Sequence, residues 1–409
     1  MKNDDLIRQI IDSHNRPLYL YSRKIMEDQA DILLNNFSGF DFLYSIKTNP
    51  FPPVVRFAAS RGFGADAASA AEVDLALAAG MAPANIFYST PGKTKADLES
   101  SLGKAHIIAD SLHELELLDQ LAAEKRMTVP AGLRVNPDFS LSGGPGVSGK
   151  FGIDLEIIYE QRDFLQSLKN ITIEGLHIHL RSQVLNSQAL AGYYAAIFDL
   201  AVSLKRDFGW NLGYINFGGG LGIVYSASED QPLDIPFLSG ECTSLWAKYK
   251  DELKARLMIE TGRFLVGKAG DYHTPIVDIK VSRGRKYLVV RSGLNGFMRP
   301  SIAALMAGSG VNGPLTKSAE PLFTSARAFE VSIVGKSGGG TETVDIVGSL
   351  CTATDILALD IDLPQAAIGD IIRVGNAGSY AYTLSPLLFS SHQPPMQIFM
   401  NSPDNLIME

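Results

Sequence analysis

A lysine stands at the end of an apolar, aromatic run near the start of this chain. Lys47 follows residues 42–46 and leads into a turn marked by Asn49-Pro50, a pattern typical of a buried strand that ends in a loop. Burying an ammonium without a partner is costly, so the lysine either extends to solvent or takes part in chemistry. Desolvated lysines have lowered pKa values and form Schiff bases with aldehydes. This stretch alone leaves both interpretations open.

Two histidines and a glutamate form a second group of candidates. His177 and His179 alternate within an expected strand, which predicts that both rings lie on the same side of it. No third His or Cys follows at ligand spacing, so we expect no metal site; a ring stacked on a flat cofactor and a hydrogen-bonded core histidine stay open. Glu260 ends an apolar run and needs a cationic partner. That partner is either a protonated pyridine nitrogen or a nearby arginine.

A glycine run follows the next expected strand. Gly218, Gly219 and Gly220 would let backbone N–H groups approach an anion closely. Arg263, just past the last expected strand of this region, would add a two-point contact to a phosphate. The alternative is a flexible surface turn, which is the default use of glycine.

The segments that must position these residues alternate between strand and helix patterns. The expected strands are 42–46, 62–66, 86–89, 106–110, 132–135, 174–179, 214–217 and 257–260. The clearest helical stretches between them are 70–79, 112–124, 155–168 and 188–205. This number of units matches a (β/α)₈ barrel, in which reactive residues gather at the carboxyl ends of the strands. An open doubly wound sheet also alternates and is the competing fold.

From about Tyr272 the pattern changes to short strands separated by Gly- and Ser-rich turns, without helical alternation. We therefore predict an α/β plus β protein. A TIM-like barrel would occupy residues 22–270, and residues 1–21 and 271–409 would form a β-sandwich or β-barrel domain. The early run Leu18–Tyr21 is expected to pair with this second domain.

Composition excludes several classes of protein. The chain has 409 residues, of which 46% are hydrophobic and 20% charged, as in a globular protein with a substantial core. The net charge of −8 argues against a nucleic-acid partner, and no apolar run is long enough to cross a membrane. Cys242 and Cys351 are too few for a disulfide framework, and no apolar segment follows the charged start. A cytoplasmic protein is expected.

Seven short motifs, in this order, give the chain a resemblance to a known family. They are Tyr44-Ser45-Ile46-Lys47-Thr48-Asn49, Asp66–Glu72, His177–Gln183, Gly218-Gly219-Gly220, Glu260-Thr261-Gly262-Arg263, Cys351 and Gly378-Ser379-Tyr380. Together they resemble the fold type III pyridoxal-phosphate decarboxylases, which include diaminopimelate, ornithine and arginine decarboxylases. The resemblance extends from about residue 17 to residue 395.

The resemblance implies pyridoxal 5'-phosphate (PLP) as cofactor and four catalytic residues. Lys47 would carry the cofactor aldehyde, Glu260 would meet the ring nitrogen, His179 would stack on the ring, and Cys351 would reprotonate the substrate. The implied cofactor-binding residues are Lys47, Asp66, His179, Ser182, Gly218, Gly219, Gly220, Glu260, Gly262, Arg263 and Tyr380. The family likeness also implies a head-to-tail homodimer, in which Cys351 and Tyr380 complete the site of the partner subunit.

Departures from the family pattern bear on the substrate. Thr352 stands where diaminopimelate decarboxylases carry Glu and ornithine decarboxylases carry Asp. Arg181 replaces a glycine, and Arg299 keeps an Arg-Pro pair without the usual tyrosine. We therefore expect an L-amino acid or conjugate with an anionic far end, as in a side branch of siderophore or antibiotic assembly, bound by Arg134, Arg181, Arg299 and Thr352.

Three alternatives stay open. The first is a diaminopimelate decarboxylase. An amino-acid racemase on a similar barrel would place an arginine at the ring nitrogen, against which Glu260 argues. A non-catalytic PLP-binding protein of the single-domain kind would lack the β domain.

Overall fold

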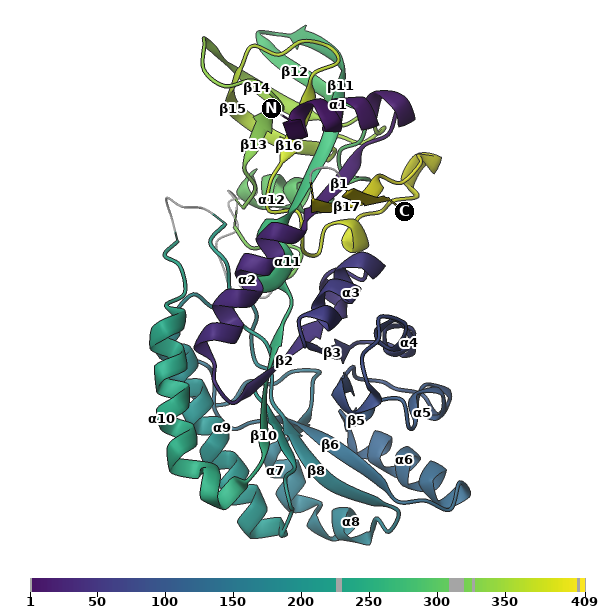
Figure 1. Cartoon of the computed structure of the whole chain (residues 1–409), viewed down its shortest axis with the longest axis vertical. Helices are drawn as coiled ribbons and strands as arrows, with labels where there is room; N and C mark the ends of the chain where they lie inside the picture. The colour runs from purple at the N-terminus through teal and green to yellow at the C-terminus, as the bar shows by residue number, and fades with distance from the viewer. Residues whose placement is uncertain (1, 226–229, 309–319, 326–327, 403–404, 409) are drawn as a thin grey trace. The chain divides into compact units, whose positions relative to one another are not determined.

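The computed structural model describes residues 2–225, 230–308, 320–325, 328–402 and 405–408. Within these ranges the chain forms two compact units. We call Ala30–Gly222 together with Pro232–Gly262 the barrel unit. The β unit consists of Met1–Gln29, Ile223–Gln231 and Arg263–Glu409. The predicted change from alternating elements to a strand-rich pattern is confirmed (Figure 1).

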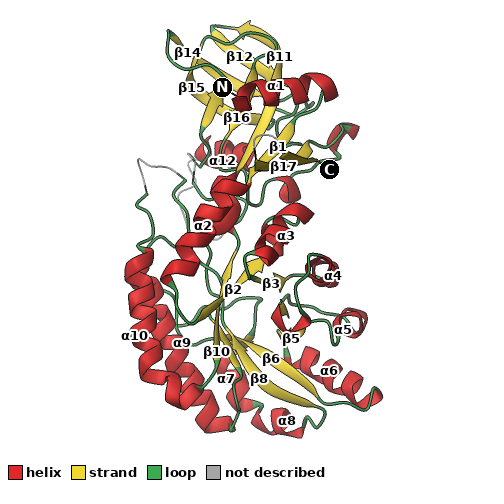
Figure 2. Ribbon diagram, in the orientation of Figure 1, coloured by secondary structure: helices red, strands yellow, loops and turns green. Residues whose placement is uncertain are grey.

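The barrel unit is built on eight parallel strands that close on themselves (Figures 1 and 2). In spatial order they are β2 (Phe40–Ser45), β3 (Gly64–Ala67), β4 (Ile86–Tyr88), β5 (His106–Ala109), β6 (Val129–Asn136), β8 (Ile171–His177), β9 (Tyr214–Asn216) and β10 (Arg256–Thr261). The pairing of β10 with β2 joins the last strand to the first, with Glu260 opposite Leu43. This pairing confirms the barrel and excludes the open sheet.

Helices surround these strands, as the red ribbons around the yellow arrows in Figure 2 show. They are α3 (Pro52–Ser60), α4 (Ala70–Ala78), α5 (Lys95–Ser101), α6 (Leu112–Glu124), α7 (Leu155–Glu160), α8 (Arg162–Ser167), α9 (Ser187–Phe208) and α10 (Ile235–Leu253). Ser69 and Ser111 cap α4 and α6 by accepting backbone N–H groups at their first turns. The single helix predicted over 155–168 is wrong: the backbone leaves the helical conformation at Gln161, without a Gly or Pro to signal it.

Apolar side chains fill the amino-terminal end of the barrel. Leu43, Phe87, Ile108, Tyr214 and Met258 form one buried cluster there. Two strand glycines make room for the Tyr214 ring, because a Cβ on Gly132 or Gly175 would lie 2.1 or 1.9 Å from its atoms. With this end packed, the polar residues that end the strands collect at the carboxyl end, where such barrels carry their chemistry.

The β unit is built on a mixed sheet and, among the described residues, also contains α1, α11 (Arg263–Val266), α12 and the start of α2 (Arg23–Asn36). Its strands are β1 (Leu18–Ser22), β11 (Gly270–Ser282), β12 (Arg285–Val290), β13 (Val331–Ile333), β14 (Thr341–Val347), β15 (Ile356–Pro364), β16 (Ile371–Val374), β17 (Met396–Ser402) and β18 (Asn405–Met408). β1 pairs antiparallel with β11 and parallel with β17, which confirms that the first strand belongs to this unit. α1 (Lys2–His14) contributes Ile7, Ile10 and Ile11 to its core.

One helix in the β unit contradicts the expectation of a purely β region. α12 (Met298–Gly308) begins directly before Arg299-Pro300. Proline is tolerated in a first helical turn, because the N–H groups there have no partner within the helix. The Arg-Pro pair therefore lies in the first turn of α12.

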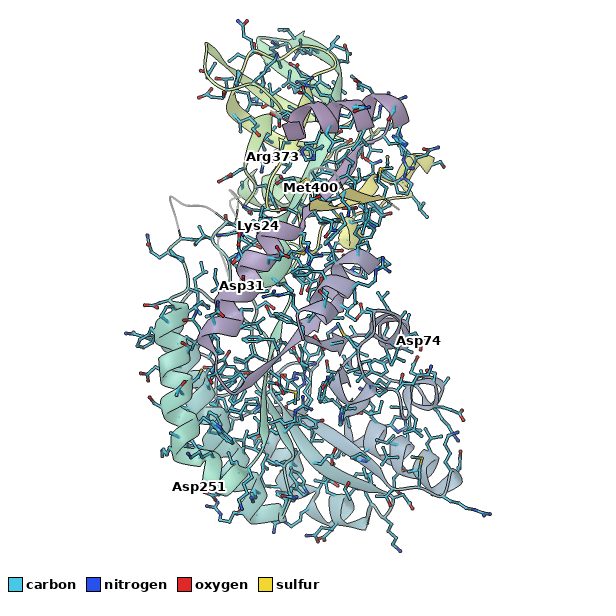
Figure 3. All side chains as sticks on the ribbon, viewed as in Figure 1. Lys24, Asp31, Asp74, Asp251, Arg373 and Met400 are labelled. Atoms are coloured by element: carbon cyan, nitrogen blue, oxygen red, sulfur yellow. The ribbon has the colours of Figure 1, made fainter. Side chains whose placement is uncertain are left out.

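Charged side chains lie on the outer faces of the helices. Figure 3 labels Asp74 on α4 and Asp251 on α10, both exposed. Asp74 accepts a hydrogen bond from Lys104 at 2.8 Å. None of the helices in the described residues is both long and apolar enough to cross a membrane.

Candidate active site

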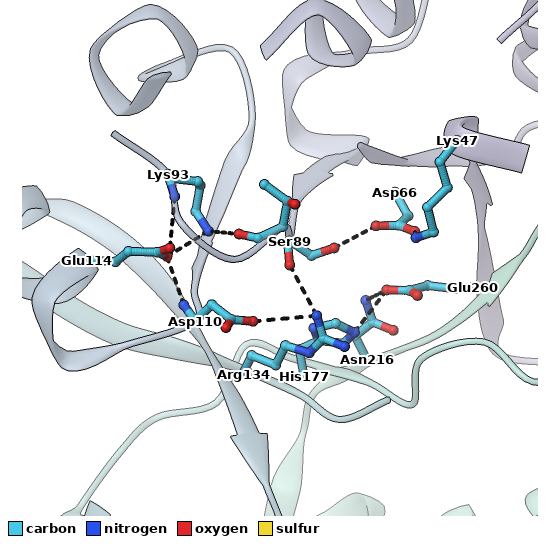
Figure 4. A network of polar contacts seen from close by, with 11 residues as sticks. Lys47, Asp66, Ser89, Lys93, Asp110, Glu114, Arg134, His177, Asn216 and Glu260 are labelled. Atoms are coloured by element: carbon cyan, nitrogen blue, oxygen red, sulfur yellow. Dashed lines mark hydrogen bonds and ion pairs between the residues drawn. The ribbon is translucent and has the colours of Figure 1, made fainter. Parts of the chain in front are cut away.

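Lys47 and Asp66 form an ion pair at the carboxyl end of the barrel. β2 ends at Ser45, and a single 3₁₀ turn, Ile46–Thr48, places Lys47 above the strand end. Its Nζ lies 2.6 Å from Asp66 Oδ2 (Figure 4). The Asp66 side chain is fully buried, whereas that of Lys47 is 43% exposed. The Lys47 amine thus pairs with a buried carboxylate while part of the lysine side chain stays exposed.

Glu260, at the end of β10, has its carboxylate fixed by two neighbouring strands. Its Oε1 accepts a hydrogen bond from Asn216 Nδ2 at 2.9 Å and lies 3.0 Å from His177 Nε2. Burial alone would raise the pKa of Glu260, but the contact with His177 and the charge of Lys47 hold it well below its usual range. The buried Glu260 carboxylate is thus kept ionised at the carboxyl end of the barrel strands.

His179 lies two residues beyond His177, the last residue of β8. Its Nδ1 accepts a hydrogen bond from the Gly219 N–H at 2.8 Å, which leaves any ring proton on Nε2. Desolvation lowers the pKa of His179 to about 4, so the ring is neutral at pH 7. Gly218 has φ +69°, and a Cβ there would lie 2.5 Å from the Ile178 carbonyl oxygen. The glycine is needed for this approach of the turn to His179.

Arg134, on β6, is enclosed within the barrel. Its Nη1 lies 3.5 Å from Asp110 Oδ1, and its guanidinium lies over the Phe151 ring at 4.5 Å. Behind Asp110, the buried pair of Lys93 and Glu114 lies at 2.7 Å, with Glu114 also accepting the Asp110 N–H (Figure 4). Asp110 and Phe151 therefore fix the position of the Arg134 guanidinium.

The other predicted barrel residues lie in the connecting turns. Arg181 is exposed, and Ser182 is half-buried, both past the end of β8. Gly262 follows β10, where a Cβ would lie 2.0 Å from Thr48 Oγ1. Gly220 has φ +135°, which favours glycine. The prediction that Arg181 contacts substrate stays a prediction.

In the β unit, Arg263 contacts Tyr380, and both were predicted to bind the cofactor. The Arg263 guanidinium lies 5.1 Å from the centre of the Tyr380 ring. Arg263 Nη1 donates to the Tyr225 hydroxyl at 2.7 Å, and Nη2 pairs with Glu320. Tyr380 has φ +51°, an uncommon conformation for a bulky residue that is typical of functional positions. Arg299 is also buried, and it donates to the Ser379 carbonyl at 3.2 Å and to Thr324 at 2.7 Å.

Cys351 lies on an exposed loop of the β unit and is a free thiol. Buried Asp355 anchors this loop by accepting the N–H groups of Leu350 and Leu294 at 2.9 and 2.6 Å. Thr352 Oγ1 lies 2.9 Å from Thr354 Oγ1. Asp355 thus fixes the loop, while Cys351 itself is exposed.

Comparison with known families identifies the chain. The model of the family described as pyridoxal-dependent decarboxylase, pyridoxal binding domain, matches residues 23–267. The chain belongs to this family. It is a PLP-dependent amino-acid decarboxylase, a carboxy-lyase, as the resemblance implied.

Relatives of this decarboxylase cover almost all of it. Diaminopimelate decarboxylase of Aquifex aeolicus is 27% identical over 386 residues, covering 93% of this chain and 85% of the relative. The L-glutamyl-(BtrI acyl-carrier protein) decarboxylase of Niallia circulans is 30% identical over 397 residues, covering 93% and 88%. The crystal structure titled diaminopimelate decarboxylase from m. jannaschi matches with a TM-score of 0.84 at 24% identity, covering 98% of this chain and 90% of that one. This last likeness supports the fold.

The residues of the barrel unit fit the cofactor of the family. An amine at Lys47, an ionised carboxylate at Glu260 and a neutral ring at His179 match the aldehyde, ring nitrogen and ring face of PLP. The N–H groups of Gly218 and Gly219 donate to Asn216 and His179, so phosphate binding by this turn stays a prediction. Thr48 Oγ1 and Thr261 Oγ1 are buried without hydrogen-bond partners among the described residues, on either side of Gly262. These are polar atoms that a bound phosphate or ordered water would satisfy.

Several polar residues at this site were not predicted from the sequence. Asn216 holds Glu260, and Ser89 donates to Asp66. Lys93 and Glu114 form the buried pair behind Asp110. One signal was available: Ser89, Asp110 and Asn216 each end or follow a barrel strand, as the predicted residues do.

Proposed function

We propose that decarboxylation takes place at the carboxyl end of the barrel strands, with Lys47, Glu260 and His179 as the residues that meet the cofactor. The observation that carries this proposal is the network in which a lysine amine and a buried carboxylate are each held by hydrogen bonds (Figure 4). When bound, PLP supplies the electron sink that accepts the electron pair left by departing CO₂.

Each residue has a distinct task in this proposal. The Lys47 amine would hold the cofactor aldehyde. Glu260, ionised and fixed by Asn216 and His177, holds a proton at the ring nitrogen. His179, neutral and oriented by the Gly219 N–H, would lie against the ring without competing for that proton. Arg263 and Tyr380, which meet in the β unit, would bind the phosphate.

We further propose that Cys351 supplies the proton that replaces CO₂ on the substrate α-carbon. An exposed thiol on a fixed loop is suited to acting on a group outside its own unit. The site would then be shared in a head-to-tail homodimer, with Cys351 completing the site of the partner subunit. Tyr380 contacts Arg263 of its own chain, which argues against the prediction that it too serves the partner.

For the substrate, we propose an L-amino acid whose far end carries a carboxylate. Diaminopimelate is the first candidate, because the Aquifex aeolicus relative and most other homologues are diaminopimelate decarboxylases. These relatives favour it over the anionic conjugate predicted from the departures in the sequence. A substrate without a far-end ammonium is the second candidate. Neutral Thr352, and the relative named for a glutamyl group on a carrier protein, support it.

A substrate panel tests the proposal. Purified protein with added PLP is incubated with meso-diaminopimelate, ornithine, lysine, glutamate and a glutamyl thioester, and CO₂ release is measured. We expect release from a substrate with a far-end carboxylate or acyl group and at least tenfold weaker turnover of ornithine and lysine. Efficient turnover of ornithine, with no gain for any other substrate, would overturn the substrate assignment. If CO₂ release is unchanged in the Lys47→Ala protein, the assignment of the active site to Lys47 is wrong.

A further inference from the structure

Asn216 ends β9, the strand that lies between β8 and β10 in the barrel. It is fully buried, and its neighbours in the register are His177 on β8 and Met258 on β10. The Asn216 carbonyl accepts the N–H of Ile178, the residue directly before His179, at 3.0 Å. The backbone of Asn216 is therefore fixed beside the segment that leads to His179.

The side-chain amide of Asn216 contacts two different partners. Its Nδ2 donates to Glu260 Oε1 at 2.9 Å, a contact drawn in Figure 4. Its Oδ1 accepts the Gly218 N–H, also at 2.9 Å. The reverse orientation of the amide would place its oxygen against the carboxylate and its NH₂ group against an N–H, so the two partners define which way the amide lies. The amide thus satisfies both partners without changing the charge of Glu260.

The glycine turn that Asn216 holds also orients His179. Gly219, the next residue of the turn, donates its N–H to His179 Nδ1 at 2.8 Å. The Gly218 carbonyl accepts the backbone N–H of Glu260 at 2.9 Å, which ties the turn to β10 as well. A continuous set of hydrogen bonds therefore connects the Glu260 carboxylate, through Asn216 and the turn, to the His179 ring.

We propose that Asn216 is a positioning residue that couples Glu260 to His179, so that the carboxylate and the ring are set in place together. This inference deepens the proposed function and rests on it, because it takes Glu260 and His179 as the residues that meet the cofactor. Asn216 acts through Glu260 and Gly218 and needs no contact of its own with cofactor or substrate. A neutral amide suits this role, because a cation at this position would neutralise the Glu260 charge and a second carboxylate would repel it.

Loss of the amide would remove both contacts at once. Asn216→Leu keeps a side chain of similar size but offers neither a donor nor an acceptor. The Gly218 N–H would lose its partner, and the turn would open more often, which exposes the Gly218 amide directly and the Gly219 amide through the turn. Glu260 would keep its contact with His177 but lose the donor on β9.

The first test follows hydrogen exchange in the PLP-free protein and does not depend on turnover. Exchange of the Gly218 and Gly219 amides is measured by mass spectrometry with fragmentation to single residues, in wild-type, Asn216→Leu and Asn170→Leu proteins. Asn170, directly before β8, is the matched control, because its Nδ2 also donates to a carboxylate, that of Asp119 at 3.2 Å. We expect both glycine amides to exchange about tenfold faster in Asn216→Leu and at the wild-type rate in Asn170→Leu.

The second test asks whether Asn216 acts through Glu260. In the PLP-loaded protein, kcat for CO₂ release is measured for the four proteins of a double-mutant cycle made from Asn216→Leu and Glu260→Gln. We expect Asn216→Leu to lower kcat by about tenfold when Glu260 is present, as for a lost hydrogen bond to a charged group. In the Glu260→Gln background the further loss should be about threefold at most, because the charge that Asn216 positions is already gone. Equal losses in both backgrounds would overturn the coupling to Glu260.

Asn216→Asp keeps the tests decisive if Asn216→Leu folds poorly. Aspartate retains the acceptor for the Gly218 N–H but loses the donor to Glu260, so we expect glycine amides that exchange as in wild type together with a kcat that is about tenfold lower. The role of Asn216 would be overturned by an unchanged kcat in Asn216→Asp. It would also be overturned by unchanged exchange of Gly218 or Gly219 in Asn216→Leu, or by an equal rise in exchange along β6. Failure of the substrate panel would instead overturn the proposed function, because exchange is measured without substrate or cofactor.

Discussion

Glu260→Gln is expected to separate catalysis from cofactor binding. The substitution keeps the size of the side chain and its ability to accept a hydrogen bond from Asn216, which lies at 2.9 Å. It removes the negative charge that His177 and Lys47 stabilise. A neutral amide cannot hold a proton on the ring nitrogen, so the electron sink weakens while the other contacts to the cofactor remain.

The size of the effect follows from the contact that is lost. A hydrogen bond to a charged group contributes about 1.5–3 kcal/mol. At about 1.4 kcal/mol for each tenfold change in rate, kcat should fall by roughly 10- to 150-fold. Cofactor affinity should fall much less, because Lys47, His179 and the phosphate contacts do not depend on this charge.

The assay measures kcat from CO₂ release and PLP affinity from an absorbance titration, in both wild-type and variant proteins. Glu241→Gln is the matched control, since Glu241 lies exposed on α10 and the substitution makes the same change of charge. An unchanged kcat in Glu260→Gln would remove Glu260 from the mechanism. Equal losses in kcat and cofactor affinity would assign it to binding alone.

Four further predictions follow from the same structure. Borohydride should fix PLP onto Lys47, and a label on another lysine would show that the aldehyde is held elsewhere. Mixed Lys47→Ala and Cys351→Ala proteins should regain part of the activity if the homodimer shares its sites; subunit exchange without rescue would place each site within one chain. Thr352→Asp should raise kcat/KM for ornithine by about tenfold, because a charge-assisted contact forms with the far-end ammonium; no gain would place residue 352 away from it. Burial lowers the pKa of His273 to about 3, below the unfolded value near 6.5, so the free energy of unfolding should decrease as pH falls from 6.5 toward 3, and by less in His273→Gln, in chemical denaturation at each pH.

The placement of the central site residues could be predicted because of one property of parallel barrels. All strands end at the same rim, so a polar residue that follows an apolar run lies near the others. This rule alone was enough to predict that four residues lie close together: Lys47, Asp66, Arg134 and Glu260. Because β10 pairs with β2, Glu260 and Lys47 lie at the ends of neighbouring strands.

The partners of these residues could not be predicted, because they depend on side-chain directions across strands. Ser89 meets Asp66 since Ala67 lies opposite Tyr88 in the register of β3 and β4. Lys93 and Glu114 are 21 residues apart, and nothing in either local pattern indicates that they pair. An arginine at the end of a strand is equally compatible with a buried network, as for Arg134, and with an exposed turn.

The proposed roles of His179 and Glu260 depend on their ionisation states, which the structure sets in opposite ways. Desolvation keeps the His179 imidazole neutral, with a pKa of about 4, while the Gly219 N–H occupies the nitrogen that would otherwise accept a proton. Two strands away, His177 and Asn216 keep Glu260 ionised although it is buried. At neutral pH the site therefore presents one uncharged flat ring and one full negative charge. A flat ligand with a protonated ring nitrogen satisfies both, whereas a ligand with a second negative charge at that position would be repelled by Glu260.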